Sequence, residues 1–271
     1  MENETIFDSI TFADNYMFQT VMMDPAICKE VVELFLGFKL KGITYPEPEK
    51  GLINTPFARS VRFDIYAEDL EGNAIDIEMQ NVNPGDLAKR SRYYQAMIDS
   101  SMITRGGKGY LGLKKCYIIF LCRGFDPFGI GEKLYRFRMR DEDGVVLKDG
   151  AERIFACTEG GEEDIPIEIL QFLSYLKNGE PTNDLTEKID AEVTRWKASA
   201  KWRKKFMENH AWEWDLLDAG EAKAEARQAA EEARLSRLAE ALEKAGKTDL
   251  LVRAIADRGY RQKLYEEYKI Q

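Results

Sequence analysis

Two short alternations of apolar and polar residues predict a β-hairpin in the first third of the chain. The segment RSVRFDIY at residues 59–66 alternates with a period of two, which is typical of a half-buried strand. The turn sequence EGN follows, and AIDIEMQ at residues 74–80 predicts a second strand of the same kind. This arrangement places Asp64, Glu78 and Gln80 on the face away from the apolar stripe, with Asp64 nearly opposite Glu78.

Helical spacing and a continuous apolar run predict the helices and the strand that precede and follow the hairpin. Apolar residues recur at helical spacing over residues 11–37, and Asp24 and Pro25 predict a restart there, as N-cap and first helical position. The turn PGD precedes a predicted helix from Leu87 to Ser101. The run KCYIIFLC at residues 115–122 predicts a fully buried central strand. A helix, an antiparallel hairpin, a helix and a buried strand together predict an α/β domain with a mixed sheet.

The remaining chain predicts a helical C-terminal appendage. The pattern indicates two short strands and then two helices, at residues 134–140, 153–157, 165–179 and 185–207. From Glu221 to Lys244 the chain is dominated by Ala, Glu, Arg and Lys, a strongly helical composition. We therefore predict a domain over residues 1–210 and a helical region over residues 211–271 that serves self-association or binding of a partner.

Composition excludes several classes of chemistry. No apolar run approaches the roughly 20 residues that span a bilayer, and the acidic start MENETIFDSI differs from a signal peptide, so we expect a cytoplasmic protein outside the membrane. Cys28, Cys116, Cys122 and Cys157 lie in apolar stretches without metal-site spacing, which predicts reduced core thiols. With His210 as the single histidine, histidine triads and histidine metal cages are excluded, and any chemistry depends on carboxylates.

Basic stretches interrupt a chain whose net charge is −9. Seven basic residues stand against two acids between Asp86 and Lys115. The segment RWKASAKWRKKF, from Arg195 to Phe206, holds six basic residues, no acid and three aromatic residues. Basic groups neutralise phosphates and aromatic faces stack on bases, so these stretches favour a nucleic-acid partner. The alternative is a basic amphipathic helix whose tryptophans lie in the core.

The two hairpin acids predict a cation site. Side chains directly opposite on paired strands have Cβ atoms about 4.5–5.5 Å apart, and like charges at that spacing repel. Asp64 and Glu78 would therefore destabilise the hairpin unless a cation lies between them or one acid is protonated. Mg²⁺ suits such a pair, because it takes carboxylate oxygens together with water and phosphate. The alternative is that both acids are simply solvated.

In their order along the chain, the hairpin acids, the helix sequence KRSRYYQAMID and the strand sequence YIIFLCRGFDPFG resemble the Rpn family of recombination-promoting nucleases and transposases. This family lies in the PD-(D/E)XK restriction-endonuclease-like superfamily. The resemblance extends from about Thr11 to Asn209. It implies a restriction-endonuclease-like mixed sheet flanked by helices. It also implies a hydrolase that cleaves DNA with Mg²⁺, or with Mn²⁺ as substitute, during recombination or transposition, with RNA as the other candidate substrate.

The resemblance also assigns roles to individual residues. Asp64 and Glu78 would ligate the ion, with the backbone carbonyl of Met79 as a third ligand. Gln80 stands where the superfamily has lysine, and it would position the attacking water by hydrogen bonding. Water activation would then fall to the metal. Asp14 matches the accessory acid near the start of the family's domain.

Six residues are predicted to contact nucleic acid: Arg90, Arg92, Tyr94, Lys201, Arg203 and Lys204. For Arg90 the alternative is a buttress for Glu78, and for Tyr94 the packing interpretation is favoured. Two further functions stay open at this point. One is a degenerate accessory protein that binds nucleic acid without cutting it, and the other is a structural interaction protein that acts through its C-terminal helices.

Overall fold

The chain forms two compact units, Met1–Arg203 and Lys204–Gln271. The computed structural model describes residues 7–44, 46–52, 60–103, 109–208, 234–247, 250–251, 254, 258–268 and 270. Each unit has a buried apolar core of its own. The role predicted for the C-terminal region, in association or partner binding, stays a prediction.

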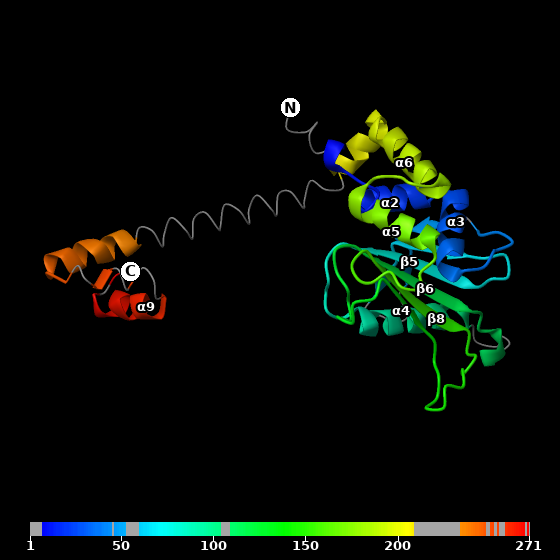
Figure 1. The fold of residues 1–271 in the computed structure, drawn as a ribbon, viewed down its shortest axis with the longest axis horizontal. Helices are drawn as coiled ribbons and strands as arrows, with labels where there is room; N and C mark the ends of the chain where they lie inside the picture. The colour runs from blue at the N-terminus through cyan, green and yellow to red at the C-terminus, as the bar shows by residue number, and fades with distance from the viewer. Residues whose placement is uncertain are drawn as a thin grey trace. The chain divides into compact units, whose positions relative to one another are not determined.

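A mixed sheet of six strands forms the centre of the first unit (Figure 1). Its strands, in spatial order, are β1 (Glu47–Pro48), β4 (Ile65–Glu68), β5 (Ala74–Gln80), β6 (Cys116–Cys122), β8 (Ala151–Cys157) and β7 (Leu134–Phe137). The β4–β5 pair is antiparallel, whereas β5, β6 and β8 run parallel to one another. The predicted α/β mixed sheet of the restriction-endonuclease type is thereby confirmed.

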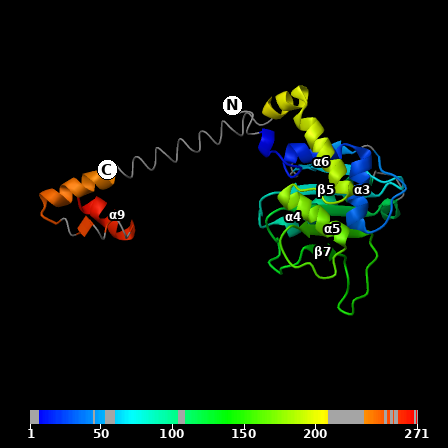
Figure 2. The ribbon, with the colours of Figure 1, turned by 45° about the horizontal axis from the view of Figure 1, so that its top comes forward.

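Helices cover both faces of this sheet (Figure 1). One face carries α2 (Asn15–Met22), α3 (Pro25–Leu36), α5 (Ile167–Asn178) and α6 (Asp184–Lys197), and the other carries α4 (Leu87–Met102). Figure 2 shows α6 beside α3, in agreement with the contacts between these helices. A short 3-10 turn, η1 (Gly109–Gly112), precedes β6.

The predicted helix boundaries follow from local capping. Asp24 accepts hydrogen bonds from the N–H groups of Ala26 and Ile27, and Pro25 begins α3. Gly179 ends α5 in the left-handed conformation, with φ of 75°, which glycine adopts without a steric cost. The restart at Asp24 and the stop at Gly179 are both confirmed.

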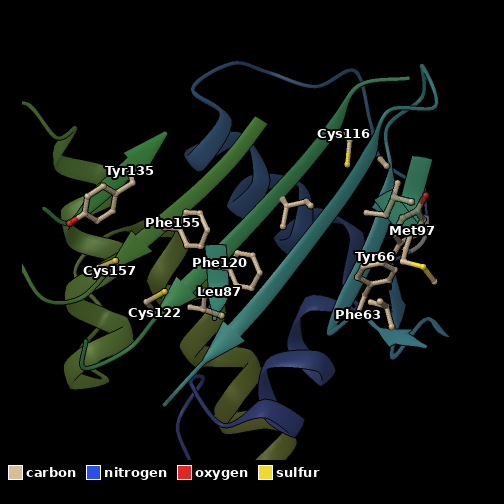
Figure 3. Packing of buried hydrophobic residues seen from close by; sticks show 14 residues of the cluster. Phe63, Tyr66, Leu87, Met97, Cys116, Phe120, Cys122, Tyr135, Phe155 and Cys157 are labelled. Atoms are coloured by element: carbon tan, nitrogen blue, oxygen red, sulfur yellow. The ribbon is translucent and has the colours of Figure 1, made fainter. Parts of the chain in front are cut away.

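Aromatic residues and thiols cover one face of the sheet, as the labelled side chains in Figure 3 show, and residues of α4 pack against them. Phe120 and Phe155 stack with ring centroids 5.0 Å apart, and α4 adds Leu87, Met97 and Ile98 to this cluster. All four cysteines are buried and free, as predicted for core thiols. The α4 face of the sheet is therefore an apolar core.

This core overturns the prediction of a half-buried hairpin. Six of the seven residues of β5 are buried, because α4 covers the face that carries the acids. The predicted first strand is also divided. β3 (Val61–Arg62) pairs with β2 (Gly51–Leu52) in a separate two-stranded sheet, and β4 begins at Ile65. Phe63 and Asp64 connect β3 to β4, so the alternation of one continuous strand does not hold there.

The long helix predicted over residues 185–207 is also divided. α6 ends at Lys197, and a second helical segment covers residues 200–208. In the second unit the described helices cover residues 234–244 and α9 (Arg258–Glu267), with a core that includes Leu238, Leu242 and Leu264. The predicted break at Gly246 is present, whereas the start of the helix predicted from Glu221 lies outside the described residues. Across the described ranges, no helix is long and apolar enough to cross a bilayer.

Candidate active site

Asp64 and Glu78 lie next to each other at one end of the β4–β5 pair. The register pairs Ile65 with Ile77, so the next step places Asp64 opposite Glu78. The backbone N–H of Asp64 donates to Glu78 Oε1 at 3.0 Å, and the N–H of Met79 donates to Asp64 Oδ2 at 2.9 Å. Each carboxylate is therefore fixed by the backbone of the neighbouring strand.

Burial makes this pair of acids costly to ionise. Glu78 is 2% exposed, and burial followed by repulsion from Asp64 raises its pKa. Burial also raises the pKa of Asp64, although the hydrogen bond from the N–H of Met79 opposes that change. Two adjacent carboxylates with raised pKa values attract either protons or a cation. A divalent cation would remove the repulsion between them.

Asp76 is a third buried acid on the same face of β5. It is fully buried, and neither of its carboxyl oxygens accepts a hydrogen bond from a donor among the described residues. Burial, together with the nearby charges of Glu78 and Asp64, raises its pKa well above the ordinary value. Asp76 therefore favours its neutral acid form more than a solvated carboxyl does. This residue could not be selected from the sequence, because the hairpin was predicted to be half-exposed.

Arg90 connects α4 to the last residue of β5. Its Nη1 donates to Gln80 Oε1 at 3.3 Å, and its Nη2 donates to Asp86 Oδ1 at 3.3 Å. The charge of Arg90 also lowers the pKa of Glu78, against the larger effect of burial. Arg90 thus orients the Gln80 amide beside the acids.

The other predicted residues of α4 differ in exposure. The ring of Tyr94 meets Phe63 edge-on, with centroids 5.2 Å apart, and lies 6.3 Å from the ring of Phe120. Tyr94 is therefore a half-buried part of the core, as the packing interpretation predicted. Arg92 is exposed on the same helix.

The start of α2 adjoins the end of β5. Asp14 caps α2 by accepting hydrogen bonds from the N–H groups of Tyr16 and Met17, each at 3.1 Å. Asn81, which follows Gln80, donates from Nδ2 to the carbonyl of Ala13 at 2.8 Å. The role of Asp14 as accessory acid stays a prediction, because its carboxylate is seen in a capping role.

α2 also contributes a residue that the sequence did not indicate. A hydrogen bond from the side chain of Gln19 is among the influences that lower the pKa of Asp64, although burial has the larger, opposite effect. Gln19 was missed because it reaches Asp64 from a distant part of the chain. Asn81, which connects the end of β5 to the start of α2, was missed because it lies beyond the end of the strand pattern. No periodic signal marks such residues.

The aromatic residues of the later basic stretch belong to the core. Trp202 is 4% exposed, and its Nε1 donates to Thr20 Oγ1 at 3.0 Å. Its ring lies 5.5 Å from that of Tyr16. Phe206 is also 4% exposed. The suggestion that Trp202 and Phe206 stack on bases is therefore wrong, because neither presents a free aromatic face.

Of the basic residues predicted in that stretch to bind nucleic acid, one makes contacts within the protein and two are exposed to solvent. Arg203 donates from Nε to the carbonyl of Lys197 and lies over the ring of Phe7, with Cζ 5.1 Å from the centroid. Arg203 is half-buried, and its contact with nucleic acid stays a prediction. Lys201 and Lys204 are exposed, and Lys204 lies 3.8 Å from Glu208. Their contact with nucleic acid stays a prediction.

The donor set at the hairpin fits a hard cation. No cluster of three or more His, Cys, Asp or Glu side chains with metal-binding geometry occurs among the described residues, so Asp64 and Glu78 need further oxygen donors. In an extended strand the N–H and C=O of one residue point to the same side. Because the N–H of Met79 points to Asp64, its carbonyl lies on the side of the acids. Two carboxylates, a carbonyl and water are a suitable set for Mg²⁺.

A mixed sheet between helices, with paired acids on the hairpin and Gln80 two residues beyond the second, defines a restriction-endonuclease-like protein. Residues 30–155 match the model of the PD-(D/E)XK nuclease family transposases, and this match confirms over those residues the resemblance predicted from the sequence. The matched range includes Asp64, Glu78 and Gln80, whereas Asp14 precedes it. No significant match was found among curated proteins or solved structures.

Proposed function

We propose that this chain is a Mg²⁺-dependent nuclease that hydrolyses phosphodiester bonds in DNA during recombination or transposition. One observation carries the proposal: Asp64 and Glu78 are buried side by side, each bound by the opposite strand. The match of residues 30–155 to a nuclease family model supports the reaction class.

Each residue of the proposed site has a separate role. Asp64, Glu78 and the carbonyl of Met79 hold the ion. Bound Mg²⁺ supplies electrostatic stabilisation of the scissile phosphate and a lowered pKa for coordinated water. Gln80, oriented by Arg90, hydrogen-bonds the attacking water. Because glutamine carries no charge, Arg90 provides the cation that lysine provides elsewhere in the superfamily.

A plasmid-nicking assay tests the proposal. Asp64→Asn and Glu78→Gln preserve the size of each side chain and an acceptor for the backbone N–H, so the fold should persist. We expect each to lose at least about 100-fold in rate, since even residues that support metal ligands are worth about 10–100-fold. Chelation of the metal should abolish cleavage by the wild type.

Glu68→Gln is the matched control, because Glu68 lies on β4 four residues beyond Asp64 and accepts a hydrogen bond from the hydroxyl of Tyr66. It should retain the rate of the wild type. Salt-sensitive binding of DNA by the wild type without metal-dependent cleavage would identify the degenerate binding protein instead. A parallel assay with an RNA of the same sequence identifies the nucleic acid that is cut.

A further inference from the structure

A cavity of about 670 Å³ lies between β3 and α4, and its lining residue Arg90 contacts Gln80, two residues beyond Glu78. Its lining includes Arg62, Lys89, Arg90, Tyr93 and Tyr94. This volume is within the range of about 300–1,000 Å³ that is typical of small-molecule sites. The cavity is therefore large enough to enclose a substrate group, and it is distinct from the carboxylates themselves.

The wall of the cavity connects to the catalytic pair. Arg90 donates to Gln80 on one side. On the other side, the charge of Arg62 lowers the pKa of Asp64, as does the hydrogen bond from the N–H of Met79, although burial has the larger, opposite effect. Two arginines of the cavity wall, Arg62 and Arg90, therefore also act on the site proposed to hold the scissile phosphate.

The lining combines positive charge with aromatic surface. Among the described residues of this lining, three cations stand against one acid, Asp86. The ring of Tyr94 is fixed by Phe63 and Phe120, while the neighbouring Tyr93 is 37% exposed. Cations bind phosphates and aromatic faces stack on bases, so this combination suits a nucleotide more than a bare phosphate or an apolar ligand.

We propose that this cavity receives one unpaired nucleotide adjacent to the scissile phosphate, with its base against Tyr93 and a phosphate at Arg62 and Lys89. The proposal rests on the nuclease function above. A base within a duplex reaches such a cavity only by leaving the stack, which is costly, and least so for a single strand or a mismatch. The enzyme should therefore cut single-stranded, bulged or mismatched nucleic acid in preference to a perfect duplex.

The test compares labelled oligonucleotides of one sequence as a single strand, a perfect duplex and a duplex with a one-nucleotide bulge. We expect cleavage of the single strand and of the bulge to exceed that of the duplex by about tenfold or more, from the usual size of base–aromatic stacking. Tyr93→Ala should remove this preference and Tyr93→Phe should retain it. Tyr110→Ala is the control, because Tyr110 is 86% exposed on η1 and does not line the cavity.

Binding supplies a second readout that does not need cleavage. The anisotropy of the same oligonucleotides is measured with Asp64→Asn alone and combined with Tyr93→Ala. The cavity proposal would be overturned by equal cleavage rates on all three substrates, by equal affinities for them, or by no binding of any of them. Metal-dependent cleavage in the same experiment would still support the nuclease function. A preference for unpaired strands in binding, without metal-dependent cleavage by the wild type, would support the cavity and overturn the nuclease function.

Discussion

Asp64 and Glu78 are held by backbone hydrogen bonds while burial and mutual repulsion oppose their ionisation. Their folded pKa values, about 6 and about 8, exceed the ordinary values of 3.8 and 4.5. At pH values between the ordinary and the folded pKa of each acid, the folded state binds more protons than the unfolded state. The contribution of these acids to the free energy of unfolding therefore decreases as the pH rises. The loss starts near pH 4 and is complete above about pH 8.

We therefore expect the metal-free protein to have a smaller free energy of unfolding at pH 8 than at pH 5, as measured by urea titration with chelator. Glu78→Gln removes one of the repelling charges, so its decrease between the two pH values should be smaller. Added Mg²⁺ should reduce the decrease in the wild type and leave the variant unchanged. The same pH dependence in wild type and variant would show that the acids do not repel as described.

Asp14 provides a second test at the scale of single residues. Asp14→Ala removes the cap of α2 and should cost about 1 kcal/mol of stability, measured by thermal or urea unfolding. Asp24→Ala removes the equivalent cap of α3 and should cost a similar amount. If Asp14 is also an accessory acid, only Asp14→Ala will lose cleavage rate at a temperature where both variants are folded. Equal rates for the two variants would limit Asp14 to capping.

The principal acids could be selected from the sequence because their positions follow from strand period and turn position. Asp64 and Glu78 are opposite each other, as the hairpin pattern predicted. Asp76 has the same period but could not be recognised, because its burial depends on α4 packing over the face that a hairpin alone would expose. Whether such a residue is buried depends on contacts that form only when the chain folds.

At the scale of elements, the helix at residues 200–208 packs on α2 through Trp202. Trp202→Ala removes a buried ring and its hydrogen bond to Thr20, so we expect a loss of about 3–5 kcal/mol in the free energy of unfolding. At temperatures where the variant stays folded, its affinity for DNA should equal that of the wild type. A loss of affinity with little loss of stability would contradict the core role.

Trp196→Ala is the matched control for this experiment. Trp196 is only half-buried on α6 and lies beneath the guanidinium of Arg195, with Cζ 4.7 Å from the ring. Its truncation should cost much less stability than that of Trp202. The sequence placed both tryptophans on one long helix, and it could not show that the helix is divided after Lys197.

The other differences between prediction and structure also arise from packing. β6 was recognised as a buried strand because its apolar run is continuous and all seven of its residues are buried. The segment at residues 59–66 has a regular alternation, yet its two halves pair in different sheets. Alternation reports which face is apolar, and it carries no information about where a strand changes partners.

At the scale of the whole molecule, separate cores predict separate unfolding of the two units. Leu242 is fully buried in the second unit, so Leu242→Ala should destabilise that unit by about 2–5 kcal/mol. Hydrogen exchange should then increase in the helices at residues 234–244 and 258–267 and stay unchanged in β5 and β6. Faster exchange throughout both units would show that they unfold together.

The proposed function depends on Asp64 and Glu78 jointly binding one divalent cation. Titration of the protein with Mn²⁺, followed by the electron paramagnetic resonance of the free ion, measures that binding directly. We expect one site in the wild type and in Glu68→Gln, competed by Mg²⁺, and its loss in both Asp64→Asn and Glu78→Gln. Unchanged Mn²⁺ binding in those two variants, or no binding by the wild type, would show that Asp64 and Glu78 do not hold the ion.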